Sequence, residues 1–116
     1  MIHGQIRKRL LERKGLADVE PKRNMSVQQL ESQLSSKFVE LMDNRMMMGA
    51  LRYGPIDGAQ NPGRQHGWNV QNALKRANEY LKSGNAELLV DVANFCMCEF
   101  EQQSHPKYHF EAKDRS

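Results

Sequence analysis

The sequence predicts an all-α fold: a small helical bundle that contains one long helix and an antiparallel helix hairpin and is completed by oligomerisation. Three observations predict it. Apolar residues between 27 and 48 recur at spacings of three and four, Ser83-Gly84-Asn85 is typical of one helix ending and the next beginning, and residues 88–100 are apolar almost all round. At 116 residues the chain fits one domain. We divide it into a basic N-terminal arm with a short helix and linker (1–24), a helical core (25–104) and a C-terminal tail (105–116).

The N-terminal arm is strongly basic. Residues 1–24 carry seven Lys or Arg and three Asp or Glu, so they hold the whole excess charge of a chain whose net charge is +3. Residues 5–14 are expected to form a short basic helix that ends at Gly15, and Pro21 marks a linker. Such an arm can contact nucleic acid or an acidic protein partner; the alternative is a solvated, partly disordered terminus.

The long helix is expected to begin at a capping box formed by Ser26 and Gln29. An apolar stripe then predicts one continuous helix to about Leu51. The stripe consists of Val27, Leu30, Leu34, Phe38, Leu41, Met42, Met46 and Met48.

A loop is expected over residues 52–68, which hold four glycines and two prolines. Long loops inside compact domains are either functional or disordered. Arg52, Arg64 and His66 make this loop a candidate for contacting an anion.

A helix hairpin is expected to follow the loop. Asn69 can cap its first helix, which ends at Ser83-Gly84, and Asn85 can cap its second helix at once, over 86–103. The apolar face of the first helix consists of Val70, Ala73, Leu74, Ala77 and Leu81. The second helix is apolar on nearly every side, and a domain this small has few elements with which to bury it. We therefore expect a dimer or a larger homo-oligomer.

One polar stripe interrupts that apolar helix. Glu87, Asp91 and Asn94 lie at i, i+4 and i+7, which places all three on one face. Carboxylates in an apolar helix are costly unless they are paired, hydrogen-bonded or bound to metal. The functional interpretation is a ligand site, with Glu87 and Asp91 as candidate ligands of Mg²⁺.

A structural interpretation of the same stripe stays open. Glu87 could complement the positive end of the helix dipole, and Asn94 could bridge helices. Asp91 could pair with an arginine such as Arg45 or Arg76.

Several other functions are disfavoured by the sequence. Cys96 and Cys98 lie two apart on a predicted helix, so they point apart and are poorly placed for a disulfide or for a zinc site with His105 and His109. No stretch approaches the roughly 20 apolar residues of a membrane span, and the start of the chain lacks the features of a secretory signal. Trp68 could stack on a base or serve as a packing anchor. The expected compartment is the cytoplasm.

The segment GNAELLVDVANFCMCEF (84–100) resembles the second core helix of MazG-like nucleotide pyrophosphohydrolases, especially the short versions of tailed phages. The combination of Arg52-Tyr53-Gly54, the hairpin and the closing segment 105–110 more closely resembles a group of uncharacterised phage proteins, over roughly 38–114. The resemblance implies a phage protein acting in the cytoplasm of an infected host cell. It also implies metal-assisted attack of water on the α–β linkage of a nucleoside triphosphate.

The chain departs from that family's acidic pattern. Asp91 matches the family's aspartate and Glu87 one acidic position before it, but the other acidic position falls on Leu88. Where the preceding helix should carry paired glutamates, near 72–76, this chain has Asn-Ala-Leu-Lys-Arg. Several carboxylates are needed to hold Mg²⁺ ions beside a triphosphate, whereas Lys and Arg suit phosphate directly.

The leading hypothesis is therefore a helical oligomer that binds a nucleotide or another small phosphorylated molecule, and in the cell could sequester it, without efficient turnover. Phosphate would contact Arg45, Arg52, Lys75 and Arg76, and a metal, ribose or base would contact Glu87, Asp91 and Asn94. Two alternatives stay open. One is a Mg²⁺-dependent pyrophosphohydrolase with a reduced acidic site, and the other is a protein-binding adaptor or inhibitor that acts through the basic arm.

Overall fold

The computed structural model describes residues 2–16, 24–54 and 66–112, and the part it describes is helical, with no strand. This confirms the predicted all-α class. The helices are α1 (Ile2–Arg13), α2 (Val27–Glu31), α3 (Ser36–Tyr53), α4 (Trp68–Ser83) and α5 (Glu87–Gln102). Within the described residues, none of these helices combines the length and apolarity that crossing a membrane requires.

The chain divides into two compact units, one of Met1–Ser35 with Glu111–Ser116 and one of Ser36–Phe110. The division falls after Ser35, whereas the sequence analysis placed the end of the arm at residue 24.

The first unit contains α1 and α2, which contact each other. The predicted short helix is present, but it begins earlier, at Ile2, and ends at Arg13, one residue before the predicted end. A turn follows at Gly15, whose φ of +68° suits a residue without a side chain. Leu10 is buried, at 5% exposure. The predicted linker around Pro21 lies outside the described residues.

The predicted capping box is confirmed at the start of α2. The Ser26 hydroxyl oxygen accepts from the Gln29 backbone N–H at 3.1 Å, and the Gln29 side-chain oxygen accepts from the Ser26 backbone N–H at 2.9 Å.

The prediction of one continuous helix from Ser26 to Leu51 is wrong, because the helix stops at Glu31 and α3 begins at Ser36. At the break, the backbone carbonyl of Gln29 accepts hydrogen bonds from side chains. The Ser32 hydroxyl donates to that carbonyl at 3.0 Å and the Gln33 amide at 2.8 Å. Such local side-chain bonds compete with helical ones.

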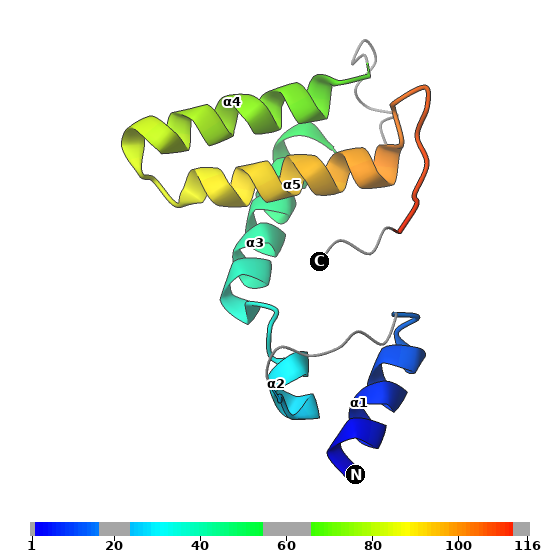
Figure 1. Cartoon of the computed structure of the whole chain (residues 1–116). Helices are drawn as coiled ribbons and strands as arrows, with labels where there is room; N and C mark the ends of the chain where they lie inside the picture. Colours follow the sequence, from blue (N-terminus) through cyan, green and yellow to red (C-terminus); the bar gives the residue numbers. More distant parts are fainter. Residues whose placement is uncertain (1, 17–23, 55–65, 113–116) are drawn as a thin grey trace. The chain divides into compact units, whose positions relative to one another are not determined.

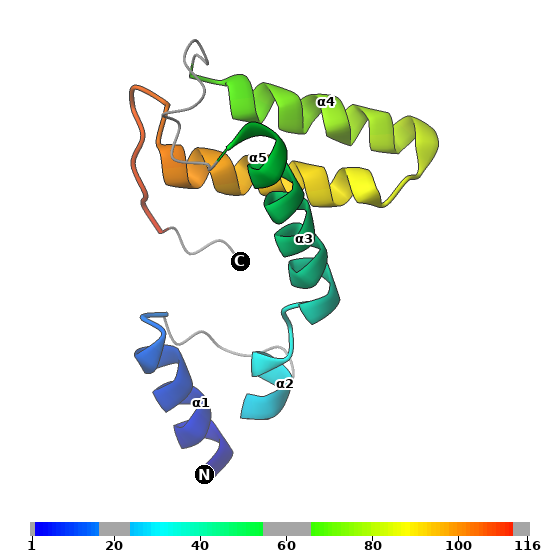
Figure 2. The ribbon, with the colours of Figure 1, turned by 180° about the vertical axis from the view of Figure 1, so that it is seen from behind.

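The second unit is a hairpin with a third helix laid across it. Helices α4 and α5 run antiparallel, as predicted, and α3 crosses one face of the pair (Figure 1). Figure 2, seen from behind, shows α3 in front of α5 and confirms that α3 covers only that face. The tight connection depends on Gly84, whose φ of +71° closes α4. Asn85 supports the start of α5 by accepting the Glu87 backbone N–H at 3.1 Å.

Asn69 does not cap α4, so that prediction is wrong. The helix begins one residue earlier, at Trp68, with Gly67 at the cap position. Asn69 lies inside the helix at 3% exposure, and its amide donates to the side-chain oxygens of Glu99 at 3.4 Å and Gln102 at 2.9 Å. A polar residue near a helix start resembles a cap in sequence, but here it joins α4 to the end of α5.

The apolar core of the second unit is small. Among its described residues, only Ala73 and Val90 are buried apolar side chains. Helix α5 is not covered all round within one copy, since Leu89 is 38% and Phe100 54% exposed.

Glu99 holds the C-terminal end of α5 to the segment that follows. Its carboxylate accepts a short hydrogen bond from the Ser104 hydroxyl and bonds of 3.2 Å from the backbone N–H groups of Ser104 and His105. The Ser104 hydroxyl is the largest cause of a lowered pKa for Glu99. Burial acts in the opposite direction, and the bonds from Asn69 and the two backbone groups lower the pKa further.

We expect this contact to make folding stability depend on pH below neutrality. The pKa of Glu99 is lower in the folded chain than its ordinary value of 4.5. Its stabilising contribution is therefore full above pH 4.5 and is lost as the pH falls through the lower folded value. Urea unfolding at pH 7 and pH 3 should show a smaller loss of stability for Glu99→Gln than for the unchanged chain. Glu101→Gln, a change at an exposed neighbour, is the control, and equal losses in all three proteins would contradict the assignment.

Candidate functional site

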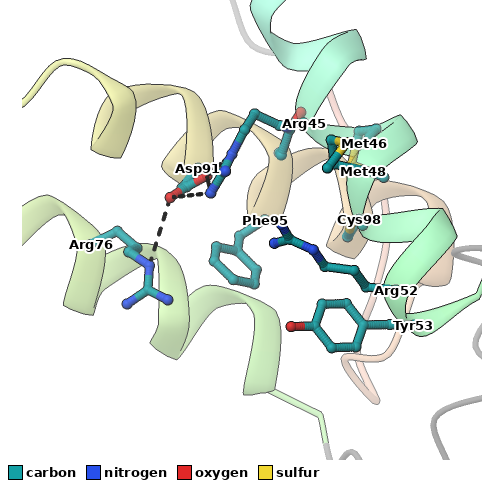
Figure 3. Close-up of a pocket in the computed structure, with 11 residues that line it drawn as sticks. Arg45, Met46, Met48, Arg52, Tyr53, Arg76, Asp91, Phe95 and Cys98 are labelled. Atoms are coloured by element: carbon teal, nitrogen blue, oxygen red, sulfur yellow. Dashed lines mark hydrogen bonds and ion pairs between the residues drawn. The ribbon is translucent and has the colours of Figure 1, made fainter.

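A cleft of about 260 Å³ lies between the C-terminal half of α3 and the α4–α5 hairpin, entirely within the second unit (Figure 3). It is lined by Arg45, Met46, Met48, Gly49, Arg52 and Tyr53 of α3, Arg76 of α4, and Asp91, Asn94, Phe95 and Cys98 of α5. The lining residues of α5 follow a spacing of three, one and three, which places them on one face of that helix. The predicted inward-facing stripe is therefore present from Asp91 onward.

Asp91 is the centre of the charged contacts in the cleft. Its side chain is only 16% exposed. Arg45 donates to its carboxylate from Nε and Nη2 at 3.2 Å each, and Nε of Arg76 lies 3.9 Å from the other oxygen. The structural interpretation named Arg45 or Arg76 as a partner for Asp91, and both are present. Asp91 thereby ties α3 and α4 to α5.

The two arginines are shared with acidic residues at the edge. Arg45 Nη1 lies 3.0 Å from Glu87, and Arg76 Nη1 lies 3.4 Å from Glu79. Glu87 itself is not part of the lining, and its side chain is 56% exposed. The sequence placed Glu87 and Asp91 on one face, but the structure puts one at the rim and the other inside.

Positive charge exceeds negative charge in the lining, with three guanidinium groups and one carboxylate. Arg52 makes no hydrogen bond or ion pair with another described residue, and its guanidinium extends toward Phe95 (Figure 3). The planar guanidinium group suits the oxygens of phosphate or carboxylate. The cleft is therefore suited to an anion.

Asn94 is a buried polar residue of the lining, at 7% exposure. Its amide nitrogen donates to the backbone carbonyl of Met42 in α3 at 3.1 Å, so it bridges two helices as the structural interpretation predicted. Its amide oxygen has no hydrogen-bond partner among the described residues. An unsatisfied buried acceptor is costly, and a donor brought by a ligand would remove that cost.

Aromatic side chains complete the cleft, and they are the part that the sequence analysis missed. Figure 3 shows the rings of Tyr53 and Phe95 near the guanidinium of Arg52. Phe95 is four residues after Asp91, and this spacing is the signal that could have placed it on the same face. Trp68 packs edge-on against Phe95 at 5.7 Å between ring centres, which matches its interpretation as a packing anchor.

Other predicted site residues lie elsewhere. Lys75 is exposed on α4 and does not line the cleft. His66 is exposed and lies edge-on to His105 at 6.0 Å. Arg64 is outside the described residues. Of the four basic residues expected to contact phosphate, the structure brings Arg45, Arg52 and Arg76 together.

The carboxylates are poorly arranged for a metal ion. Glu87 and Asp91 both contact the guanidinium of Arg45, whose positive charge opposes a cation there. In the described parts of the chain, no three or more His, Cys, Asp or Glu side chains come together as a metal site would require, and this includes the zinc arrangement considered above. The residues present suit an anion better than Mg²⁺.

Comparisons of the chain with protein-family models, curated proteins and solved structures found no match. The resemblance of residues 84–100 to MazG-like proteins therefore stays a prediction from those residues.

Proposed function

We propose that the chain binds a nucleotide or another small phosphorylated molecule in this cleft and releases it unchanged. The observation that carries the proposal is the cluster of Arg45, Arg52 and Arg76 around one enclosed carboxylate. Arg52 supports it most, because no described residue neutralises its charge.

The phosphate group would lie between Arg52 and Arg76. Both guanidinium groups line the cleft, and Arg52 can offer two parallel N–H donors to phosphate oxygens. Arg76 can offer Nη2, since its Nε and Nη1 face Asp91 and Glu79. Asp91 pairs with Arg45 and Arg76 and so joins the three helices, but its negative charge competes with phosphate for the same arginines. The phosphate would keep clear of this carboxylate.

The remainder of the ligand would contact the aromatic and amide groups. The rings of Tyr53 and Phe95 offer apolar surfaces for a base, and the amide oxygen of Asn94 offers an acceptor for a base N–H or a ribose hydroxyl. A volume of about 260 Å³ lies just below the usual range of ligand clefts, roughly 300–1,000 Å³. A nucleotide with few phosphates therefore fits better than a dinucleotide.

Binding without turnover agrees with the charges of the cleft. Metal-assisted hydrolysis of a triphosphate requires several carboxylates free to hold Mg²⁺. Here the two candidate carboxylates are paired with Arg45. In an infected host cell, a protein of this kind would sequester a phosphorylated signal.

Incubation with nucleoside mono-, di- and triphosphates, with and without Mg²⁺, tests this proposal. We expect nucleotide to be retained with the protein on ultrafiltration and to be recovered intact by anion-exchange chromatography. Arg76→Ala should reduce retention about tenfold or more. Lys75→Ala is the matched control, because it removes the neighbouring positive charge on the same helix outside the cleft.

Each outcome of this experiment is informative. Retention that is equal in Arg76→Ala and Lys75→Ala would contradict binding in the cleft. Mg²⁺-dependent release of pyrophosphate would favour the hydrolase instead, and no retention of any nucleotide would overturn the proposal.

A further inference from the structure

The face of the α4–α5 hairpin that α3 leaves uncovered carries two apolar stripes. Figure 1 looks onto this face, with α3 crossing behind it. The hairpin stripes, as we name them, are Val70, Leu74, Ala77 and Leu81 of α4 and Leu89, Ala93, Cys96 and Phe100 of α5. At about 100° per residue, Leu74 points roughly opposite to Arg76, and Cys96 roughly opposite to Asp91 and Cys98, which line the cleft. The stripes and the cleft thus lie on opposite sides of the hairpin.

The hairpin stripes are exposed although they are apolar. Leu74 is 61%, Leu81 79% and Val70 45% exposed, so most of the face expected to be the core side of α4 is open. On α5, Leu89 and Phe100 are likewise open, and Phe110 packs edge-on against Phe100 at the end of that stripe. A continuous apolar surface of this size often marks an interaction site.

The spacing of the stripes favours another helix as their partner. Both stripes step by four, three and four residues, the pattern by which helices pack side by side in bundles. The face contains no charged residue within the eight positions, so it offers nothing to attract nucleic acid or an acidic protein. An uncharged face is also free of the like-charge repulsion that would oppose pairing with itself.

The small core gives a reason why this face must be covered. Among the described residues of the unit Ser36–Phe110, only Ala73 and Val90 are buried apolar side chains. A single core in a unit of this size supplies only modest stability, which association with a second copy would increase. A second copy is available wherever the chain itself is made, which an unrelated partner is not.

The area of the face suits a weak dimer. Two 16-residue helices are each about 24 Å long, and with axes about 10 Å apart and side chains on both sides the pair is about 20 Å wide, so the face measures on the order of 450 Å² per copy. Two copies would bury about 900 Å² together, at the low end of interface sizes, which corresponds to a concentration-dependent dimer.

We infer that two copies of the chain associate through the hairpin stripes, placing their α4–α5 hairpins face to face as a four-helix bundle. The inference does not depend on the proposed function, because the stripes lie away from the cleft. A symmetric pair would leave both clefts open on the outer sides of the bundle.

Light scattering of the purified full chain over a range of concentrations tests the inference. The unchanged chain should be a dimer. Leu74→Glu should raise the dimer dissociation constant about 100-fold or more, since symmetry places two carboxylates in one apolar interface. Lys75→Glu is the matched control: it puts a carboxylate on an exposed position of the same helix about 100° away from Leu74, and it should remain dimeric. A monomeric unchanged chain, or a Leu74→Glu chain as dimeric as the control, overturns the inference.

Alkylation of Cys96 gives a second test, which uses the unchanged chain and so does not depend on a variant that folds. Cys96 is exposed in one copy and lies within the α5 stripe. In the dimer, iodoacetamide should modify Cys96 at least about tenfold more slowly than in the chain unfolded by guanidinium, because a thiol must be accessible to react. Tandem mass spectrometry separates its product from that of Cys98. A folded chain whose Cys96 reacts as fast as in the unfolded chain overturns the inference.

Discussion

Replacing Arg52 with alanine is expected to lower the affinity for phosphorylated ligands about ten- to a hundredfold, without changing the stability of the fold. A hydrogen-bonded contact between charged groups contributes roughly 1.5–3 kcal/mol, which corresponds to that range. Stability should be unchanged because Arg52 makes no ion pair or hydrogen bond with another described residue. Calorimetric titration measures the affinity, and thermal unfolding measures the stability.

Two further variants make the Arg52 result specific. Arg52→Lys keeps the charge but loses the fork of parallel donors, so it should recover only part of the affinity. Lys37→Ala removes a positive charge from an exposed position of the same helix and should leave the affinity unchanged. If Arg52→Ala binds as well as the unchanged chain, Arg52 does not contact the phosphate.

Replacing Asp91 with asparagine should have the opposite pattern, a loss of stability with the affinity for phosphate kept or increased. The Asp91 carboxylate is mostly buried and joins Arg45 of α3 and Arg76 of α4 to α5. The pair lies between an exposed ion pair and a fully buried one, so we expect a loss of about 1–3 kcal/mol in the free energy of unfolding. Affinity should not fall, because the variant removes a negative charge that competes for the same arginines. Urea unfolding and titration of the same preparation measure both quantities.

Glu87→Gln is the matched control for Asp91→Asn. Glu87 contacts the same Arg45, but its side chain is 56% exposed, so the change should cost less than about 1 kcal/mol. Loss of nucleotide binding by a well-folded Asp91→Asn protein would show that the carboxylate itself contacts the ligand or a metal, as the hydrolase alternative requires.

Local signals in the sequence predicted much of the fold. Gly84 and Asn85 carry the turn of the hairpin, and the pairing of Ser26 with Gln29 gives the start of α2. These features act within a few residues, so composition and spacing are enough to find them.

Features that depend on contacts between distant residues could not be predicted in the same way. In the sequence, Asn69 resembles a helix cap. In the structure, it bonds to Glu99 and Gln102, which are thirty and thirty-three residues away. The periodicity of α4 shows that Leu74 and Leu81 share a face, but not that α5 packs beside that face and leaves it open.

The candidate site, like the fold, was predicted where local spacing decides it and missed where distant contacts decide it. The spacing of Asp91 and Asn94 predicted that both side chains share one face, and both line the cleft. The same spacing could not predict that Glu87 lies outside the cleft, because the position of α3 decides which residues of the stripe are enclosed. The contribution of Phe95 was also hidden, because an aromatic residue in an apolar helix looks like core in sequence.

Calorimetric titration of the unchanged chain tests the central claim most directly, with a nucleoside and its mono-, di- and triphosphates each titrated with and without Mg²⁺. The arrangement of Arg45, Arg52 and Arg76 predicts binding of phosphorylated forms with dissociation constants on the order of 1–100 µM, independent of Mg²⁺, and much weaker binding of the unphosphorylated nucleoside. The absence of binding by every phosphorylated form, or equal binding of the nucleoside, would contradict it.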